Sequence, residues 1–316
     1  MNPHTRLRKF FPTRNKAFRE LLGTVEKVLD HDVNVLILGE HGVGKDYLAE
    51  AIHVCGPRAA APFVSIDCSS LPHEIFESEL FGHERGAFTD AQTQKIGRIE
   101  MARGGTLYFD RVASLPSTLQ AKLLRLIQER RFSRLGSNRT LDLDARVISS
   151  AGGTLEDSLS ETGFRKDLYY RLNVVTVDLP PLRKRREDIP PLAELFLRNA
   201  TRASSGRKKA IGEAAMAILV DYSWPGNVRE LRNVIDRAAL LEDGSVITPE
   251  SLPVERFVTA GDLLVAGTDL TWSLEELEKR YIREILRQTG QNYSRASEIL
   301  GINRKTLLEK RKRYGL

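Results

Sequence analysis

A short apolar run that leads directly into a glycine-rich turn and a lysine constrains the fold of this chain most. Residues 33–38 read VNVLIL, a composition typical of a buried parallel strand. Glycines let backbone N–H groups surround phosphates, the following helix offers its positive end, and the lysine reaches the outer phosphates. The pattern predicts a P-loop in an α/β fold. Its candidate cofactor-binding residues are Gly39, Glu40, His41, Gly42, Val43, Gly44, Lys45 and Asp46.

Length and composition constrain the number of domains and the cellular compartment. A chain of 316 residues with 41% hydrophobic content can bury substantial cores, and its length predicts two or three domains. Cys55 and Cys68 are too few for a disulfide framework and lack zinc-site spacing, which favours a reducing cytosol. No uninterrupted apolar run reaches membrane-spanning length, and the charged segment 1–8 has no apolar core behind it. We therefore expect a cytoplasmic protein without a membrane partner.

The net charge of +6 is unevenly distributed along the chain. Residues 279–316 contain 11 Lys and Arg against 3 Glu, so the rest of the chain is close to neutral. A short basic segment on a balanced body is typical of contact with a nucleic-acid backbone. A solvated helical face is the alternative interpretation.

Residues 77–91 read ESELFGHERGAFTDA. This segment resembles the bacterial enhancer-binding proteins, AAA+ ATPases that remodel sigma-54 RNA polymerase and carry the signature GAFTGA. One position differs, with Asp90 in place of glycine. The resemblance implies a nucleotide-sensitive surface loop that contacts sigma-54 through Gly86, Phe88 and Thr89. An ordinary turn, in which Gly and Asp serve local backbone geometry, is the competing interpretation.

Two residues of the P-loop bear on this resemblance. Asp46 occupies the position where many P-loops have a magnesium-binding hydroxyl, and enhancer-binding proteins commonly carry an acidic residue there. His41 stands where they usually have Ser or Thr. The departure at Asp46 therefore supports the family, whereas His41 by itself indicates only a tolerated loop residue.

A second predicted strand, residues 105–109, ends in Asp110. The resemblance makes Asp110 a Walker B aspartate that orders Mg²⁺ through a water molecule. The family's next residue is the glutamate that polarises the attacking water, but this chain has Arg111, which cannot accept a proton. Arg111 could still bind the γ-phosphate of ATP. We therefore expect ATP binding with slow or absent hydrolysis.

Two further positions differ around this site. Asp67 matches the asparagine that holds the catalytic glutamate in the family, so Asp67 and Arg111 could form a charge-assisted pair. The alternative is that Asp67 is a common variant unrelated to Arg111. A third predicted strand, 144–150, leads to Gly152 where the family shows a sensor asparagine. A second hydrolytic group is therefore expected to be missing.

Three arginines match other working parts of the family. The segment FRKDLYYRLNV resembles the one that sends arginine fingers into a neighbouring subunit, which implies that role for Arg165 and Arg171. The segment WPGNVREL resembles the sensor II region, with Arg229 directed at the γ-phosphate. A planar fork of donors suits both tasks. Surface ion pairs are the alternative, whereas fingers would imply self-association into a ring.

The tail contains a helix-turn-helix pattern. Ser273 can cap an amphipathic run that Gly290 ends, and residues 294–300, a turn at 301–302 and a basic helix over 303–314 follow. It resembles the Fis-type DNA-binding domain of enhancer-binding proteins. A three-helix interaction module is the alternative. The candidate base and phosphate contacts are Asn303, Arg304, Lys305, Thr306, Lys310, Arg311, Lys312 and Arg313.

The fold expected from these features is an α/β AAA+ P-loop core with a parallel sheet, a small helical lid and an all-α helix-turn-helix domain. The expected boundaries are 1–181 for the core, 182–257 for the lid, 258–272 for a linker and 273–316 for the DNA-binding domain. We expect no N-terminal regulatory domain, because the P-loop strand begins near Val33.

The leading functional hypothesis is an ATP- and DNA-binding regulator of sigma-54 RNA polymerase holoenzyme at enhancer DNA. It would act in a ring, of which a ring mixed with an active paralogue is one form. One alternative is a fully active ATPase that uses Glu100 or Asp67 as base. The other is a nucleotide-gated repressor or anti-activator without remodelling activity.

Overall fold

The structure is a computed structural model in which the chain divides into two compact units, residues 1–247 and residues 248–316. Each unit is described by itself. The residues described are 7–69, 73–88, 91–153, 163–203, 209–252, 274–289 and 292–314.

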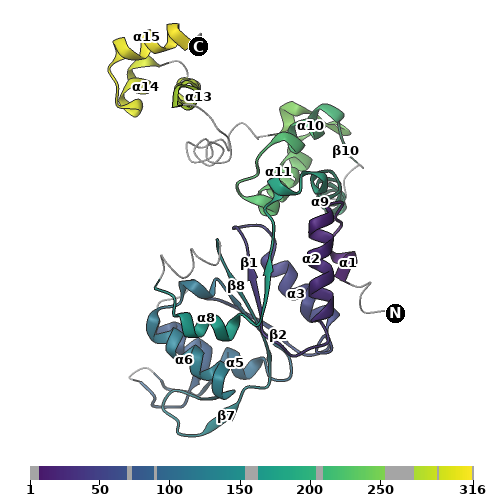
Figure 1. Cartoon of the computed structure of the whole chain (residues 1–316), viewed down its shortest axis with the longest axis vertical. Coiled ribbons are helices and arrows are strands. Elements are labelled where there is room, and N and C mark those ends of the chain that lie inside the picture. The colour runs from purple at the N-terminus through teal and green to yellow at the C-terminus, as the bar shows by residue number, and fades with distance from the viewer. Residues whose placement is uncertain are drawn as a thin grey trace. The chain divides into compact units, whose positions relative to one another are not determined.

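A five-stranded parallel sheet forms the centre of the first unit (Figure 1). Its spatial order is β2 (Phe63–Asp67), β5 (Thr106–Asp110), β8 (Arg146–Ala151), β1 (Val35–Leu38) and β9 (Val175–Asp178). Every neighbouring pair is parallel. The carboxyl ends of the strands therefore meet at one edge, where open α/β sheets bind ligands.

The three predicted strands are all present, with shifted starts. β1 and β8 begin two residues later than expected, and β5 begins one residue later and includes Asp110. Asn34 donates its side-chain amide to the Arg171 carbonyl, and Asp144 pairs with Arg58. These polar side chains make bonds to other segments just before β1 and β8 begin.

Helices cover both faces of the sheet (Figure 1). Val35 and Ile37 point into the core under α1 (Leu7–Phe10), α2 (Lys16–Lys27) and α3 (Lys45–Cys55). Leu36 and Leu38 point into the opposite core, because successive strand residues alternate between faces. The helices of that side are α4 (His73–Phe81), α5 (Arg98–Met101), α6 (Ser117–Glu129) and α8 (Lys166–Leu172).

Two short antiparallel pairs extend from this core. They are β3 (Gly82–His83) with β4 (Lys95–Ile96), and β6 (Arg131–Ser133) with β7 (Thr140–Asp142). The two pairs are joined, because Leu135 donates its N–H to Gly82 and accepts from the N–H of Glu84. The segment that contains Phe88 therefore follows residues that are hydrogen-bonded to the second pair.

The lid follows the last sheet strand. Two 3₁₀ turns, Leu182–Lys184 and Arg186–Asp188, lead into three helices and a small parallel pair. Trp224 is fully buried and donates its indole N–H to the Leu219 carbonyl at 2.7 Å. The lid elements are α9 (Ile189–Ala203), β10 (Ala210–Ile211), α10 (Glu213–Asp221), α11 (Asn227–Leu241) and β11 (Val246–Ile247).

The second unit begins with a 3₁₀ turn, Pro249–Ser251, and contains α13 (Leu274–Gln288), α14 (Tyr293–Leu300) and α15 (Arg304–Tyr314). Ile282, Leu286 and Leu307 lie in its core. Gly301 makes the turn between α14 and α15 at φ 64°. Three predicted boundary features lie outside the described residues, namely the cap Ser273, the linker 258–272 and the helix stop Gly290.

The boundary of the basic helix differs from the prediction by one residue. α15 begins at Arg304, and the Asn303 side chain accepts a hydrogen bond from the Thr306 N–H at 2.8 Å. Asn303 therefore serves as a cap and lies outside the helix. Among the described helices, none combines the length and apolar character that a bilayer crossing requires.

Candidate nucleotide-binding site

The predicted P-loop links β1 to α3. Gly42 has a φ of 75°, and a Cβ there would lie 2.2 Å from the Gly226 carbonyl oxygen of the lid, so only glycine fits. Lys45 Nζ donates to the carbonyls of Gly39 at 2.7 Å and Glu40 at 2.9 Å. Burial lowers the pKa of Lys45 although Asp110 and Asp46 oppose this effect. The lysine is thus held within the loop at the carboxyl edge of the sheet.

The side chain of Glu40 contacts the lid. Its two carboxylate oxygens accept from Arg183 at 2.8 and 2.6 Å, and Asn227 Nδ2 donates to it at 3.1 Å. The hydrogen bond from Arg183 lowers the pKa of Glu40 despite partial burial. The side chain of Glu40, a predicted cofactor-binding residue, connects the P-loop to the lid. Sequence reasoning missed Arg183 and Asn227, since neither lies in the P-loop.

Arg229 of α11 reaches the P-loop from the lid. Its Nη1 donates to His41 Nε2 at 2.5 Å, its Nη2 lies 3.9 Å from Asp46 Oδ2, and its backbone N–H donates to Gly42. Burial and the nearby cations Arg229 and Lys45 lower the pKa of His41. His41 is therefore a neutral acceptor. The structure brings Arg229 to the loop, where the resemblance implies a sensor.

Tyr108 connects the two carboxylates of this edge. Its hydroxyl lies 2.8 Å from Asp46 Oδ1 and 3.2 Å from Asp110 Oδ1. Ser150 Oγ donates to Asp110 Oδ1 at 2.5 Å. Burial, with help from both carboxylates, raises the pKa of Tyr108, so it remains a neutral donor. Sequence reasoning missed Tyr108, although its place two residues before Asp110 puts both on one face of the strand.

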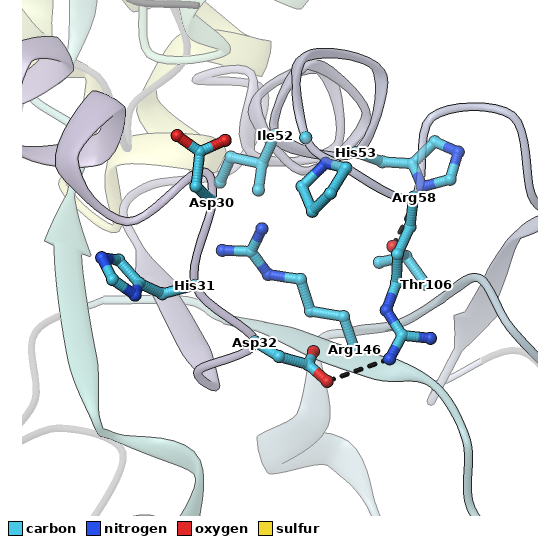
Figure 2. A pocket seen from close by; sticks show the side chains of 10 residues that line it. Asp30, His31, Asp32, Ile52, His53, Arg58, Thr106 and Arg146 are labelled. Atoms are coloured by element: carbon cyan, nitrogen blue, oxygen red, sulfur yellow. Dashed lines mark hydrogen bonds and ion pairs between the residues drawn. The ribbon is translucent and has the colours of Figure 1, made fainter.

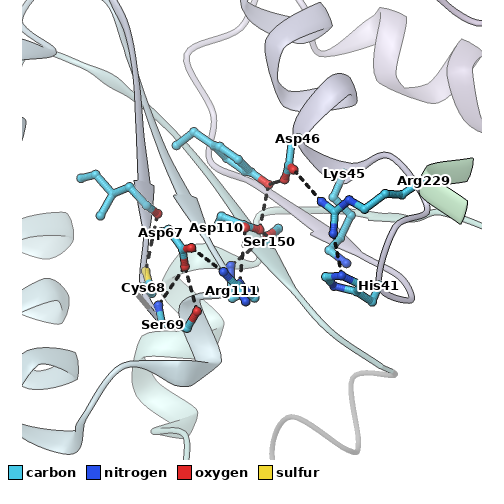
Figure 3. A network of polar contacts seen from close by, with 12 residues as sticks. His41, Lys45, Asp46, Asp67, Cys68, Ser69, Asp110, Arg111, Ser150 and Arg229 are labelled. Carbon is cyan, nitrogen blue, oxygen red and sulfur yellow. Dashed lines mark hydrogen bonds and ion pairs between the residues drawn. The ribbon is translucent and has the colours of Figure 1, made fainter. Parts of the chain in front are cut away.

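Arg111 lies between Asp67 and Asp110 (Figure 3). Its Nη2 donates to Asp67, its Nε lies 3.5 Å from Asp110 Oδ2, and its backbone N–H donates to Ser150 Oγ at 3.0 Å. Partial burial opposes ionisation of Asp67, but bonds from Ser69 and the Arg111 guanidinium hold the pKa of Asp67 below its ordinary value. The predicted pair of Asp67 and Arg111 is present.

The backbone of Arg111 adopts φ 55° and ψ 47°, a left-handed conformation that costs a non-glycine residue about 1–2 kcal/mol. The backbone bond to Ser150 and the side-chain contact with Asp67 hold it there. The guanidinium is thus fixed at the carboxyl ends of β2 and β5.

The residues at Asp110 do not fit a magnesium ion. Oδ1 of Asp110 already accepts from Ser150 and lies near Tyr108, while Oδ2 faces the Arg111 guanidinium. A divalent cation at the same carboxylate would be repelled by that guanidinium. Within the described ranges, no group of three or more His, Cys, Asp or Glu is arranged to hold a metal.

The other two hydrolysis candidates are positioned as follows. Gly152 follows β8 directly, so the sensor position has no side chain. Glu100 binds Arg134 through both carboxylate oxygens, at 2.7 to 2.9 Å. Arg134 also contacts Glu84 at 2.9 Å. Glu100 therefore belongs to an ion cluster with the segment that carries Phe88.

The two predicted finger residues lie at opposite ends of α8. Arg165 precedes the helix and pairs with Asp167 at 2.7 Å, and its backbone N–H donates to Gln120. Arg171 is exposed in the last turn, next to exposed Tyr170. Both arginines therefore lie on the surface of this chain.

The segment predicted to contact sigma-54 is partly described. Gly86 has φ 82°, and its N–H donates to the Ala91 carbonyl at 2.8 Å. Phe88 is 45% exposed and packs edge-on against the His83 ring at 4.9 Å between centroids. Thr89 and Asp90 lie outside the described residues. The Phe88 ring is thus presented on a closed turn with one supporting contact.

The basic residues of α15 differ in their contacts. Arg304, Lys305 and Lys312 are exposed, and Arg311 lies over the Tyr293 ring at 5.3 Å. Lys310 pairs with Glu278 of α13 at 2.6 Å, which raises the pKa of Lys310 through the hydrogen bond.

Arg313 at the end of α15 pairs with Glu275 of α13 at 2.7 Å. The charges of Lys310 and Arg313, both predicted as phosphate contacts, are therefore partly offset inside this unit.

A cavity lies at the amino ends of the strands, near Thr106 and Arg146 (Figure 2). Arg146 is only 4% exposed and donates to the carbonyls of Leu29 and Val28 at 2.8 and 2.7 Å. His53 contacts Thr106 at 2.9 Å. These bonds tie β8 and β5 to the neighbouring helices, which is a structural role.

Three segments of the chain match known protein families. Residues 11–178 match a family described as "Sigma-54 interaction domain", and residues 183–261 match "AAA+ ATPase lid domain". Residues 273–314 match "Bacterial regulatory protein, Fis family". The order of the three matches agrees with the predicted architecture.

Comparisons with individual proteins over most of this chain agree with these matches. The chain is 45% identical to the transcriptional regulatory protein ZraR of Klebsiella oxytoca over 93% of its own length and 66% of that protein. It is 42% identical to the regulatory protein AtoC of Escherichia coli K12 over 96% and 67%. The chain thus spans about two thirds of these relatives.

A solved structure, NtrX from Brucella abortus in complex with ATP, superposes with a TM-score of 0.70 at 36% identity. The match covers 96% of this chain and 69% of NtrX. NtrX was also solved in complex with ADP, with the same TM-score and identity. The AAA+ core, helical lid and helix-turn-helix domain are therefore shared with a nucleotide-binding relative.

Proposed function

The chain belongs to the bacterial sigma-54-dependent regulators, AAA+ proteins with a Fis-type DNA-binding domain, and we propose that it binds ATP and enhancer DNA but hydrolyses ATP slowly. The observation that supports this most strongly is Arg111 in the place of the catalytic glutamate, with its guanidinium bound to Asp67. A positioned general base contributes about 10²–10⁴-fold to a reaction rate, and arginine cannot supply that contribution.

The two alternative bases are engaged elsewhere. Asp67 accepts from Ser69 and Arg111, and Glu100 is bound to Arg134. A self-sufficient ATPase would have to release one of these carboxylates. The contacts therefore favour the slow reaction.

The expected partners follow from the family. Gly86, Phe88 and Thr89 would contact sigma-54 RNA polymerase holoenzyme, and α15 would enter the major groove of enhancer DNA. We propose that the chain acts in the cytoplasm. We also keep the division into core (1–181), lid (182–257), linker (258–272) and DNA-binding domain (273–316).

The proposed mode of action is self-association into a ring, either of this chain alone or mixed with an active paralogue. Arg165 just before α8 and Arg171 in its last turn are surface residues, so they could act on a neighbour's site while the subunit's own site stays ATP-bound. Purification without such a paralogue, combined with full activation by this chain alone, would contradict the mixed ring. If the chain binds DNA and ATP but activates transcription neither alone nor together with a paralogue, the nucleotide-gated repressor is the function that remains.

Steady-state ATP hydrolysis by the purified full chain tests the proposal. The native protein should turn over no faster than Lys45→Ala, which removes the main phosphate contact. The double variant Asp67→Asn/Arg111→Glu restores both family residues and should gain at least about tenfold. Arg125→Glu on the surface of α6 is the matched control. Brisk hydrolysis by the native protein would refute the proposal.

The sequence also suggested Mg²⁺ as a cofactor, held through Asp110. The Arg111 guanidinium beside Asp110 argues against that ion, and the consequence is developed below.

A further inference from the structure

Charged groups gather at the carboxyl edge of the sheet around the P-loop (Figure 3). Three are cations and three are carboxylates, so their formal charges cancel. They are Lys45, Arg111 and Arg229, with Asp46, Asp67 and Asp110.

A glutamate at position 111 would change this balance. The six side chains would then carry a net charge of −2, and a nucleoside triphosphate would bring further negative charge to the same edge. P-loop sites ordinarily offset such charge with a divalent cation bound to the phosphates. Arg111 differs from glutamate by two positive charges, which equals the charge of that cation.

The guanidinium of Arg111 is held in a fixed position. Asp67 accepts a hydrogen bond from it and Asp110 forms an ion pair with it, while the backbone N–H of Arg111 donates to Ser150 Oγ. A pre-organised guanidinium is a good phosphate ligand because it loses little rotamer freedom on binding. Its Nε is buried and has no hydrogen-bond acceptor among the described residues.

The field of Arg111 reaches the P-loop. Arg111 contributes to lowering the pKa of Lys45 and of His41, after burial and nearer cations. Its charge therefore acts where the outer phosphates of a bound nucleotide would lie next to Lys45.

We propose that this site binds nucleoside triphosphate without a divalent cation, and that the Arg111 guanidinium supplies the positive charge that a metal ion would bring. The inference rests on the proposed function in that ATP is the ligand. The inference differs from the proposed function because it concerns the metal requirement of nucleotide binding and not the rate of hydrolysis.

Equilibrium binding of a fluorescent, non-hydrolysable ATP analogue to the full chain tests this, with excess magnesium chloride or excess EDTA. The native Kd should agree within about threefold between the two conditions. Arg111→Gln should weaken binding in EDTA by about tenfold, equivalent to about 1.4 kcal/mol, and magnesium should restore most of that loss. Arg125→Gln, the same exchange on the surface of α6, should behave like the native chain.

Two results would overturn the inference. The first is native binding that tightens by tenfold or more when magnesium is added. The second is an Arg111→Gln protein whose magnesium dependence equals that of the native chain. Arg111→Lys, which keeps the charge, should retain metal-independent binding and covers the case in which the glutamine variant does not fold.

The two proposals fail separately. Brisk hydrolysis by the native chain would refute slow turnover but leave the Kd ratio unaffected, because the analogue is not hydrolysed. A large Kd ratio would refute metal-independent binding and leave slow turnover standing.

Discussion

Replacing Asn227 with alanine should weaken the attachment of the lid to the P-loop. Asn227 is fully buried, and its Oδ1 accepts from the Leu182 N–H at 2.8 Å. Its Nδ2 donates to Glu40 at 3.1 Å and to the His41 carbonyl at 3.0 Å. Each buried polar group left without a partner costs about 1–3 kcal/mol. The residue also has φ 52°, which alanine tolerates less well than asparagine.

Two backbone groups lose their partner in Asn227→Ala, namely the buried Leu182 N–H and the partly buried His41 carbonyl. The expected loss of unfolding free energy is therefore about 3 kcal/mol. For a unit of about 250 residues this corresponds to a fall in Tm of about 6–12 °C.

Fluorescence of Trp224, buried in the lid, provides the readout in a Trp272→Phe background, since these are the 2 tryptophans of the chain. Asn233→Ala, an exposed site on the same helix, is the matched control and should change Tm by less than 2 °C, equivalent to at most about 1 kcal/mol. If Asn227→Ala unfolds within 2 °C of the parent, the buried bonds do not hold the lid and the reasoning is wrong.

Three further predictions follow from the described contacts. Burial lowers the pKa of His53 below its ordinary 6.5, so protonation favours the unfolded chain and stability should fall as pH drops below about 6.5. In His53→Gln, the urea midpoint should lose part of this pH dependence. An unchanged dependence of the midpoint on pH would contradict the assignment. Lys312→Ala should reduce the salt slope of DNA binding by about one, whereas Glu278→Gln should strengthen binding because it releases Lys310; equal losses for Lys310→Ala and Lys312→Ala in a filter or anisotropy titration would argue against the pairing. Tyr108→Phe removes the hydroxyl between two carboxylates and should lower the unfolding free energy by about 1–2 kcal/mol, measured by urea denaturation; a more stable variant would show that the hydroxyl contributes nothing.

Sequence alone identified the elements whose signals are contiguous in the chain. The apolar run, glycine turn and lysine at residues 33–46 predicted a strand, a P-loop and a helix, and the structure contains β1, the loop and α3 in that order. The three-helix tail was predicted for the same reason, whereas the helical lid was predicted through the family resemblance. Short-range patterns fix such units because the interactions that form them join residues a few positions apart.

The contacts of individual site residues required the tertiary structure. Arg111 meets Asp67 and Ser150 because the sheet places β5 between β2 and β8, an order that no local pattern records. Asp67 was correctly predicted as its partner only through the family resemblance. Tyr108 joins the site because its strand face also carries Asp110, and its hydroxyl reaches the start of α3 across the sheet edge.

The same limit explains the prediction for Glu40. The P-loop pattern predicts Glu40 as a cofactor-binding residue, and only the structure shows that its carboxylate binds Arg183, which lies 143 positions later in the chain. Sequence determined which residue types the nucleotide edge contains. Only the packing of the lid against the P-loop decided which of them face each other, because contacts between residues so far apart depend on the whole fold.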